Sequence, residues 1–164
     1  MFLANSHGVW DCSLPVHRRK ADSRLIEDIV FTSQMNPMFL MKSIKTAYGS
    51  SPFYEHFEEG LGELFNKYGN PRQSLLEFNL QTIRWVEEEL GIKSIKISSK
   101  YVNCDDEIDF RIKSKLTCNK WKYKPYPQVF EDRNGFIDGR SILDAIFHGG
   151  AEAKRWWTSV SLQS

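Results

Sequence analysis

Residues 51 to 91 carry the pattern that most restricts the folds open to this chain, because two helical periodicities follow each other with start and stop residues around them. Ser51 suits the N-cap of the first helix, and Pro52 suits its first helical position, where a missing N–H costs nothing. One apolar stripe at helical spacing follows: Phe53, Phe57, Leu61, Leu64, Phe65 and Tyr68. Gly60 and Gly62 each cost about 1 kcal/mol relative to alanine, so we expect a core-facing helix with a break near its middle.

The second helix is predicted to open at residues 70 to 73 with a variant of the capping box and to end at Gly91. Its main apolar stripe consists of Leu76, Leu80, Ile83, Val86 and Leu90. Phe78 and Trp85 point to a different side, which predicts burial on two faces. The acidic run at residues 87 to 89 is interpreted as solvated helix surface.

Strands are expected on both sides of these helices. Residues 1–4 and 9–16 have strand-like composition and are separated by a turn at residues 5–8 that suits a hairpin. Residues 24–31 and 94–98 are predicted as further strands. Another helix is predicted after Pro37, ending at Gly49, with these residues on its apolar side: Phe39, Ile44, Ala47 and Tyr48.

These elements together predict a single α/β domain, a mixed sheet with flanking helices. The first strand begins at Met1, and domains rarely open inside a strand. We therefore expect an incomplete N-terminal edge, with an upstream segment missing. The alternative is a short edge strand that simply starts the protein.

Composition excludes several classes of function. Lys and Arg total 22 against 21 Asp and Glu, for a net charge of +1, which provides no footprint for nucleic acid or an anionic membrane. The three cysteines, without paired spacing, argue against a disulfide framework, and no ligand spacing suggests zinc. No apolar run approaches the roughly 18 residues that a membrane span needs. A cytoplasmic protein without metal or cofactor is expected.

Two polar segments are candidates for a site. Residues 105–109 hold four acids but lack the spacing of a calcium loop, so a charged loop is the plainer interpretation. Asp109 and Arg111 would share one face of an extended segment. Residues 124–136 are interpreted as an ordered hairpin, with a strand at 128–132 and a turn at 133–135, because linkers seldom carry so many aromatic and apolar residues.

We expect Asp109, Arg111, Tyr126 and Gln128 to converge on one cleft, since alternate residues of an extended segment share a face. The competing interpretation is that these four side chains only satisfy one another. Ser141 and Asp144 form an S-x-x-D capping box before an apolar run, which makes Asp144 a helix cap unless it has a chemical role.

Four motifs occur in an order that resembles the WbqC-like protein family, most closely its Bacteroidetes branch: SSPFYEHF, DEIDFR, YPQVFEDRNGF and SILDAIFHGGAEA, with SLPV near the start. The resemblance implies that residues 1–164 are one domain, the C-terminal three quarters of the family's domain. It also implies a place in gene clusters for O-antigen and other surface polysaccharides. Leu40–Met41, Pro127 and His148 depart from the family's usual residues, which leaves an inactive copy open.

Two functions therefore stay open. In the first, a transferase acts on a sugar nucleotide or a lipid-linked sugar: Arg111 binds an anionic group with Tyr126 and Gln128 as further ligand-binding residues, and Asp109 or Asp144 is the base or hydroxyl anchor. In the second, a non-catalytic accessory protein binds a glycan-assembly enzyme through an aromatic surface, which would be formed by Trp85, Trp156 and Trp157.

Overall fold

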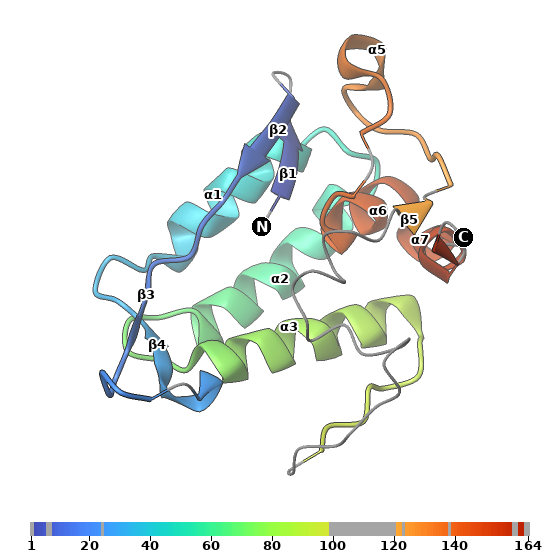
Figure 1. Ribbon diagram of the computed structural model, residues 1–164. Coiled ribbons are helices and arrows are strands. Elements are labelled where there is room, and N and C mark those ends of the chain that lie inside the picture. Colours follow the sequence, from blue (N-terminus) through green and yellow to red (C-terminus); the bar gives the residue numbers. More distant parts are fainter. Residues whose placement is uncertain are drawn as a thin grey trace.

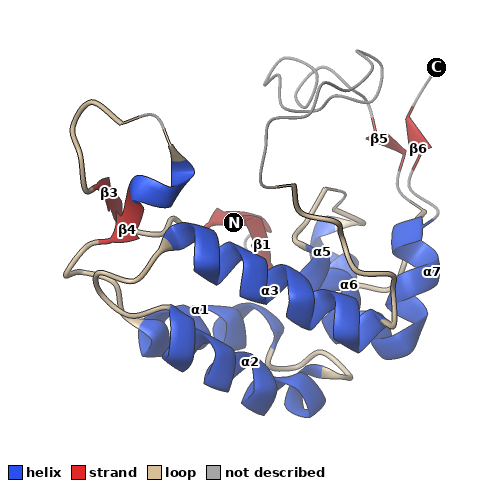
Figure 2. Cartoon of the chain, turned by 90° about the horizontal axis from the view of Figure 1, so that it is seen from below, coloured by secondary structure: helices blue, strands red, loops and turns tan. Residues whose placement is uncertain are grey.

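The computed structural model describes residues 2–5, 8–23, 25–98, 121–122, 124–137, 139–158 and 161–162. Its helices are α1 (Pro37–Tyr48), α2 (Tyr54–Tyr68), α3 (Leu75–Leu90), α5 (Glu131–Asn134), α6 (Ile142–Gly149) and α7 (Ala153–Thr158), with 3-10 turns η1 (Ile26–Asp28) and η2 (Gly150–Glu152). Strands accompany them, so the predicted combination of helices and strands is confirmed. Helices α1, α2 and α3 lie side by side, and α6 and α7 sit at one end of this layer (Figures 1 and 2).

The described strands form three two-stranded antiparallel sheets. They pair β1 (Phe2–Asn5) with β2 (Gly8–Asp11), β3 (Val16–Arg18) with β4 (Ile29–Phe31), and β5 (Trp121–Lys122) with β6 (Ser161–Leu162). The first pair confirms the predicted N-terminal hairpin, since Asn5 faces Gly8 across the turn. The strand expected at residues 94–98 is wrong: no described strand pairs with it, and Ile95 and Ile97 stay 62% and 59% exposed.

The helix ends follow capping chemistry, although two of them differ from the predicted positions. Asn36 caps α1 through Oδ1, which accepts the N–H groups of Met38 and Phe39 at 3.0 and 3.3 Å. Helix α2 begins at Tyr54 rather than at Pro52, because the chain first makes a turn in which the Tyr54 N–H donates to the Ser51 carbonyl at 3.1 Å. Gly91 ends α3 in the left-handed conformation, as predicted (φ 54°).

Helix α3 starts at Leu75 with Ser74 as its N-cap, later than the predicted opening. The amide of Gln73, a member of the predicted capping box, closes the preceding turn. Its Oε1 accepts the Asn70 N–H at 2.7 Å, and its Nε2 donates to the Lys67 carbonyl at 2.7 Å. A capping-box residue thus ties the end of α2 to the start of α3.

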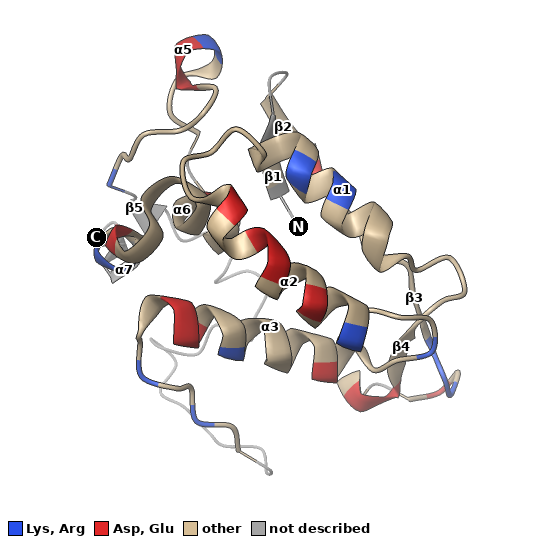
Figure 3. Cartoon of the chain, turned by 180° about the vertical axis from the view of Figure 1, so that it is seen from behind, with Lys and Arg blue, Asp and Glu red and all other residues tan. Residues whose placement is uncertain are grey.

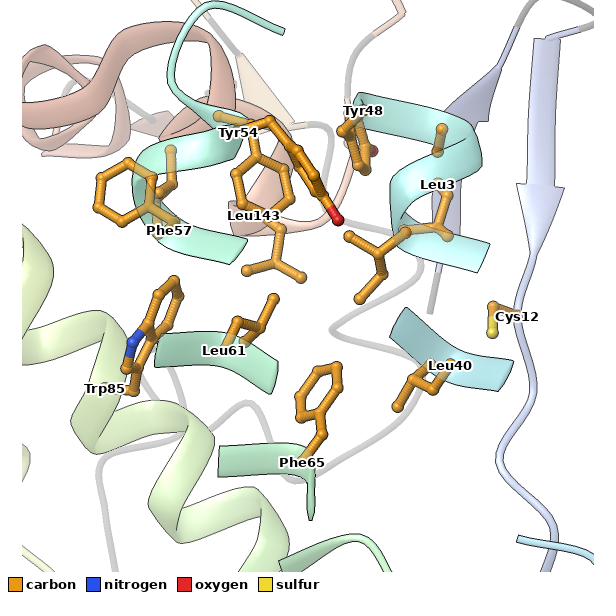
Figure 4. Packing of buried hydrophobic residues seen from close by; sticks show 14 of the residues in the cluster. Leu3, Cys12, Leu40, Tyr48, Tyr54, Phe57, Leu61, Phe65, Trp85 and Leu143 are labelled. Carbon is orange, nitrogen blue, oxygen red and sulfur yellow. The ribbon is translucent and has the colours of Figure 1, made fainter. Parts of the chain in front are cut away.

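Aromatic and aliphatic side chains together fill the core between the helices (Figure 4). Phe147 of α6 is fully buried, and its ring lies 5.3 Å from that of Tyr48 on α1 and 5.2 Å from that of Tyr54 at the start of α2. These contacts join α6 to the three-helix layer, so the core fixes the position of α6 and of every polar group on it.

Helix α3 buries Phe78 and Trp85, as predicted, together with Leu90 from the aliphatic stripe. Phe78 packs edge-on against Phe31 at 5.3 Å, and Trp85 packs edge-on against Phe57 at 6.0 Å. Ile83, a member of the predicted main stripe, is 41% exposed. The predicted burial of the second apolar line is therefore confirmed, and aromatic partners on α2 and β4 explain why it is buried more completely than Ile83.

Acidic residues lie on exposed faces of α2 and α3 (Figure 3). Glu88 and Glu89 are exposed, as the solvated-surface interpretation predicts. Glu87 is the exception, since it is buried and accepts the backbone N–H of Ile95 at 2.5 Å. It thus holds the chain that leaves α3.

Helix α2 runs without interruption through Gly60 and Gly62, so the predicted break is wrong. A Cβ added at Gly62 would meet its nearest neighbour, Met41 Cε, at 3.9 Å. Gly62→Ala is therefore expected to raise the free energy of unfolding by about 0.5–1 kcal/mol, because alanine loses less backbone entropy on folding. Urea unfolding measures the change, and Gly91→Ala, at a positive φ, should have the opposite sign.

Candidate functional site

Three of the five predicted site residues meet at the N-terminal half of α6. The Tyr126 hydroxyl donates to Asp144 Oδ2 at 2.5 Å, and Gln128 Nε2 donates to the same oxygen at 2.8 Å. Asp109 and Arg111 lie outside the described residues, so their predicted convergence with the other candidates stays a prediction.

Tyr126 and Gln128 belong to residues 124–137, which we call the strap. Pro125 and Pro127 favour an extended start, and residues 124–128 have no helix or strand. The predicted strand at 128–132 is wrong: the chain turns into the short helix α5, which projects from the body (Figures 1 and 3) and ends at Gly135 with φ 66°. The predicted packing is confirmed, since Val129 and Phe130 are half-buried, but Asn134 ends α5 and Gly135 caps it, so no hairpin turn forms there.

The Gln128 side chain bonds to the backbone at the far end of the strap. Its Nε2 donates to the Ile137 carbonyl at 3.0 Å, and its Oε1 accepts the Ile137 N–H at 2.8 Å. The side-chain amide therefore pairs with Ile137 as a neighbouring strand would. Because Nε2 also donates to Asp144, both of its N–H groups and its oxygen are used.

Asp144 is fully buried. Its Oδ2 accepts two hydrogen bonds, whereas its Oδ1 accepts none from the described part of the chain. Ser141 is the N-cap of α6, as predicted, and its hydroxyl accepts the Leu143 N–H at 3.4 Å. The Asp144 carboxylate turns to the strap instead of completing the capping box, so that part of the cap interpretation is wrong.

His148, which was not among the predicted site residues, joins the same network. Its Nε2 accepts the Val129 N–H at 2.8 Å, and its Nδ1 lies 2.7 Å from the Asp144 carbonyl oxygen. Since Nε2 accepts, the ring is neutral and its proton is on Nδ1, which donates to that carbonyl. The sequence signal that could have identified His148 is its spacing of four residues from Asp144, which puts both side chains on one helix face.

A cavity of about 10 Å³ lies beside these groups, with Gln128, Asp144 and His148 in its wall. The space accommodates about one water molecule. Within the described residues, no three His, Cys, Asp or Glu side chains are grouped so that they could hold a metal ion. The network can orient a buried carboxylate and a neutral imidazole, but it leaves no room for a larger molecule while the strap is in place.

The model of the WbqC-like protein family matches residues 2–119. The chain belongs to this family. No curated protein and no solved structure matches it. The family match ends before the strap, so Tyr126, Gln128, Asp144 and His148 lie C-terminal to the matched range. In the part of this family member that the structure describes, no helix has the length and apolar character to cross a membrane.

Aromatic contacts also fasten the strap of this family member. The Tyr126 ring stacks on Trp156 at 4.8 Å with an interplanar angle of 5°, and Phe136 packs edge-on against it at 5.3 Å. Trp156 fits because Gly149 has no side chain: a Cβ there would collide with the indole ring. Trp156 is half-buried in this stack.

The aromatic docking surface predicted from three tryptophans does not form at two of them. Trp85 is 8% exposed and packs in the core, and Trp156 packs on Tyr126. The side chain of Trp157 lies outside the described residues. Two of the three rings are therefore used within the protein itself.

Burial raises the pKa of the Tyr126 hydroxyl above its ordinary value, and the Asp144 carboxylate raises it further. The folded protein then keeps this proton to a higher pH than the unfolded chain, so stability is lost as pH rises above about 10. We expect Tyr126→Phe to flatten the fall of the unfolding midpoint between about pH 10 and 12. The pKa of Tyr54 is raised as well, by burial first and then by Glu58, so the residual slope should disappear only when Tyr54→Phe is added. An unchanged slope in the double variant would contradict the prediction.

Proposed function

We propose that this protein acts in the cytoplasm in the assembly of a surface polysaccharide, as a transferase on a sugar nucleotide or a lipid-linked sugar. Membership of the WbqC-like family supports the polysaccharide setting. One observation of the site carries the chemical role: Asp144 is fully buried, yet its Oδ1 accepts no hydrogen bond from the described residues.

A carboxylate with a purely structural role is expected to have both oxygens satisfied when it is buried, because each unsatisfied polar atom costs free energy. Tyr126 and Gln128 saturate Oδ2 and thereby fix the orientation of the carboxylate. Oδ1 is left to accept a hydrogen bond or a proton from a sugar hydroxyl, which suits a general base or hydroxyl anchor. Tyr126 and Gln128 are then positioning residues.

Asp109 and Arg111 complete the proposal with the roles expected for them from the sequence. Arg111 would bind an anionic group, and a forked guanidinium suits the phosphates of a sugar nucleotide. Asp109 is the alternative base. Both residues lie outside the described part of the chain, so their contribution rests on their spacing in the sequence.

A non-catalytic accessory role is the second candidate, and one observation favours it. Asp144 is closed from solvent, and the cavity beside it, about 10 Å³, is far smaller than a sugar. Catalysis at Asp144 therefore requires the strap to move, whereas an accessory protein could keep it closed.

Asp144→Asn tests the proposal in a host strain that lacks the endogenous gene. We expect the asparagine variant to lose surface polysaccharide by about tenfold or more, as removal of a general base does, while its unfolding midpoint stays close to that of the wild type. Gel analysis of the polysaccharide and thermal unfolding provide the two readouts. Asp132→Asn, on the exposed helix α5, is the matched control and should retain normal polysaccharide.

Two results would contradict a catalytic Asp144. Normal polysaccharide with Asp144→Asn would remove Asp144 from the chemistry and favour the accessory role. If Asp144→Asn does not fold, Tyr126→Phe replaces it as the test. This variant retains the Asp144 carboxylate and removes only one of its hydrogen-bond donors. If Tyr126→Phe loses polysaccharide only in proportion to its loss of stability, the network has a structural role.

A further inference from the structure

The strap is fastened to α6 through a small set of polar contacts. Tyr126 and Gln128 both donate to Asp144, and the Val129 N–H donates to His148. The last of these depends on the protonation state of the acceptor, because an imidazole nitrogen accepts a hydrogen bond only while it carries no proton. We infer that the strap is a pH-dependent cover over Asp144, closed while His148 is neutral and released when His148 is protonated.

Protonation changes the contact between His148 and Val129 from attraction to repulsion. The added proton goes to Nε2, which lies 2.8 Å from the Val129 nitrogen, so two N–H groups would point at each other. A flip of the ring does not relieve the conflict, since both nitrogens of an imidazolium carry protons. Nδ1 retains its bond to the Asp144 carbonyl oxygen in either state. The strap is therefore the side that must move.

The groups that face His148 from the body of the protein allow it to be charged. On α6, Asp144 Oδ1 lies 3.9 Å from Nδ1, close enough for attraction between an imidazolium and a carboxylate. Tyr48 faces it from α1 with ring centroids 6.1 Å apart, and Tyr126 faces it from the strap at 6.4 Å. Among the described residues that line the adjoining cavity, there is no lysine or arginine. The charge is thus accommodated on α6, while the hydrogen bond to the strap is lost.

Release of the strap would uncover the one fully buried carboxylate beside it. Asp144 is 0% exposed with the strap closed, and two of the contacts that cover it come from Tyr126 and Gln128. If the proposed function is right, the release also admits substrate. The inference itself does not depend on that function, because opening is measured without any activity.

Hydrogen exchange of residues 125–137 tests the release. After correction for the intrinsic pH dependence of exchange, we expect protection in the wild type to be about tenfold lower at about pH 5.5 than at about pH 7.5. His148→Gln should show constant protection, because its amide oxygen can accept the Val129 N–H and does not titrate. His56→Gln, on the exposed face of α2, is the matched control and should retain the response.

Nitrogen NMR of the histidine rings provides a second, independent measurement. The spectra show whether the His148 ring carries a proton on Nδ1 alone or on both nitrogens at each pH at which exchange is recorded. A doubly protonated His148 with undiminished protection of the strap would overturn the inference, as would a pH response that persists in His148→Gln. Neither outcome bears on whether Asp144→Asn loses polysaccharide, so failure of the cover and failure of the proposed function are distinguishable.

Discussion

Phe147→Ala is expected to lower the free energy of unfolding by about 3–5 kcal/mol, the range found when a fully buried phenylalanine is truncated. Phe147 is 0% exposed, and its ring contacts those of Tyr48, Tyr54 and Phe57. Alanine would leave a cavity where α6 meets α1 and α2, and rigid aromatic neighbours on several sides cannot collapse to fill it. Urea unfolding at neutral pH measures the loss.

Phe39→Ala is the matched control, since it makes the same chemical change on a surface. Phe39 is 63% exposed, so its truncation should change stability by no more than about 0.5 kcal/mol. Equal losses at the two positions would show that α6 is not joined to the helical layer through Phe147. The Phe147 variant should also lose protection in the strap, because the strap is fastened to α6.

Helix α1, which carries Phe39, shows how far periodicity can predict this fold. The existence and ends of α1 followed from Pro37 and Gly49, because capping and proline geometry are local. Of its predicted apolar side, Ile44, Ala47 and Tyr48 are buried, whereas Phe39 is exposed. Residues 38–41 are four consecutive apolar residues, so no period selects among them, and tertiary contacts decide that Leu40 is buried and Phe39 is exposed.

The site could be predicted in part for a related reason. Tyr126 and Gln128 were named because alternate residues of an extended segment share a face, and Asp144 was named from its place at a helix start. What the sequence could not supply was the contact between residues 126–129 and residues 144–148, because no local rule encodes which helix a strap crosses. His148 was missed for this reason: without Val129 opposite it, a histidine four residues after an aspartate has many plausible roles.

Gln128→Glu is expected to lower the free energy of unfolding by about 3 kcal/mol at neutral pH and to open the strap. Glutamate has nearly the same shape as glutamine, so no cavity is created. It cannot donate while ionised, so the Ile137 carbonyl and Asp144 Oδ2 both lose a donor. It also places a second negative charge where Nε2 now lies 2.8 Å from the Asp144 oxygen. Urea unfolding and hydrogen exchange of residues 125–137 measure the two effects.

Gln81→Glu provides the control, because Gln81 also donates through Nε2 to a carboxylate, Glu77 Oε1 at 2.7 Å, but on the exposed side of α3. Solvent screens the new repulsion there, so the loss should stay below about 1 kcal/mol. Acid separates the causes further, since one proton shared between the introduced glutamate and Asp144 would restore a hydrogen bond between them. The recovery of stability at about pH 5 should be measured with His148→Gln also present, so that protonation of the histidine does not open the strap at the same time. If the two glutamate variants lose equal stability, or if acid restores nothing, the carboxylate of Asp144 is not what holds the strap.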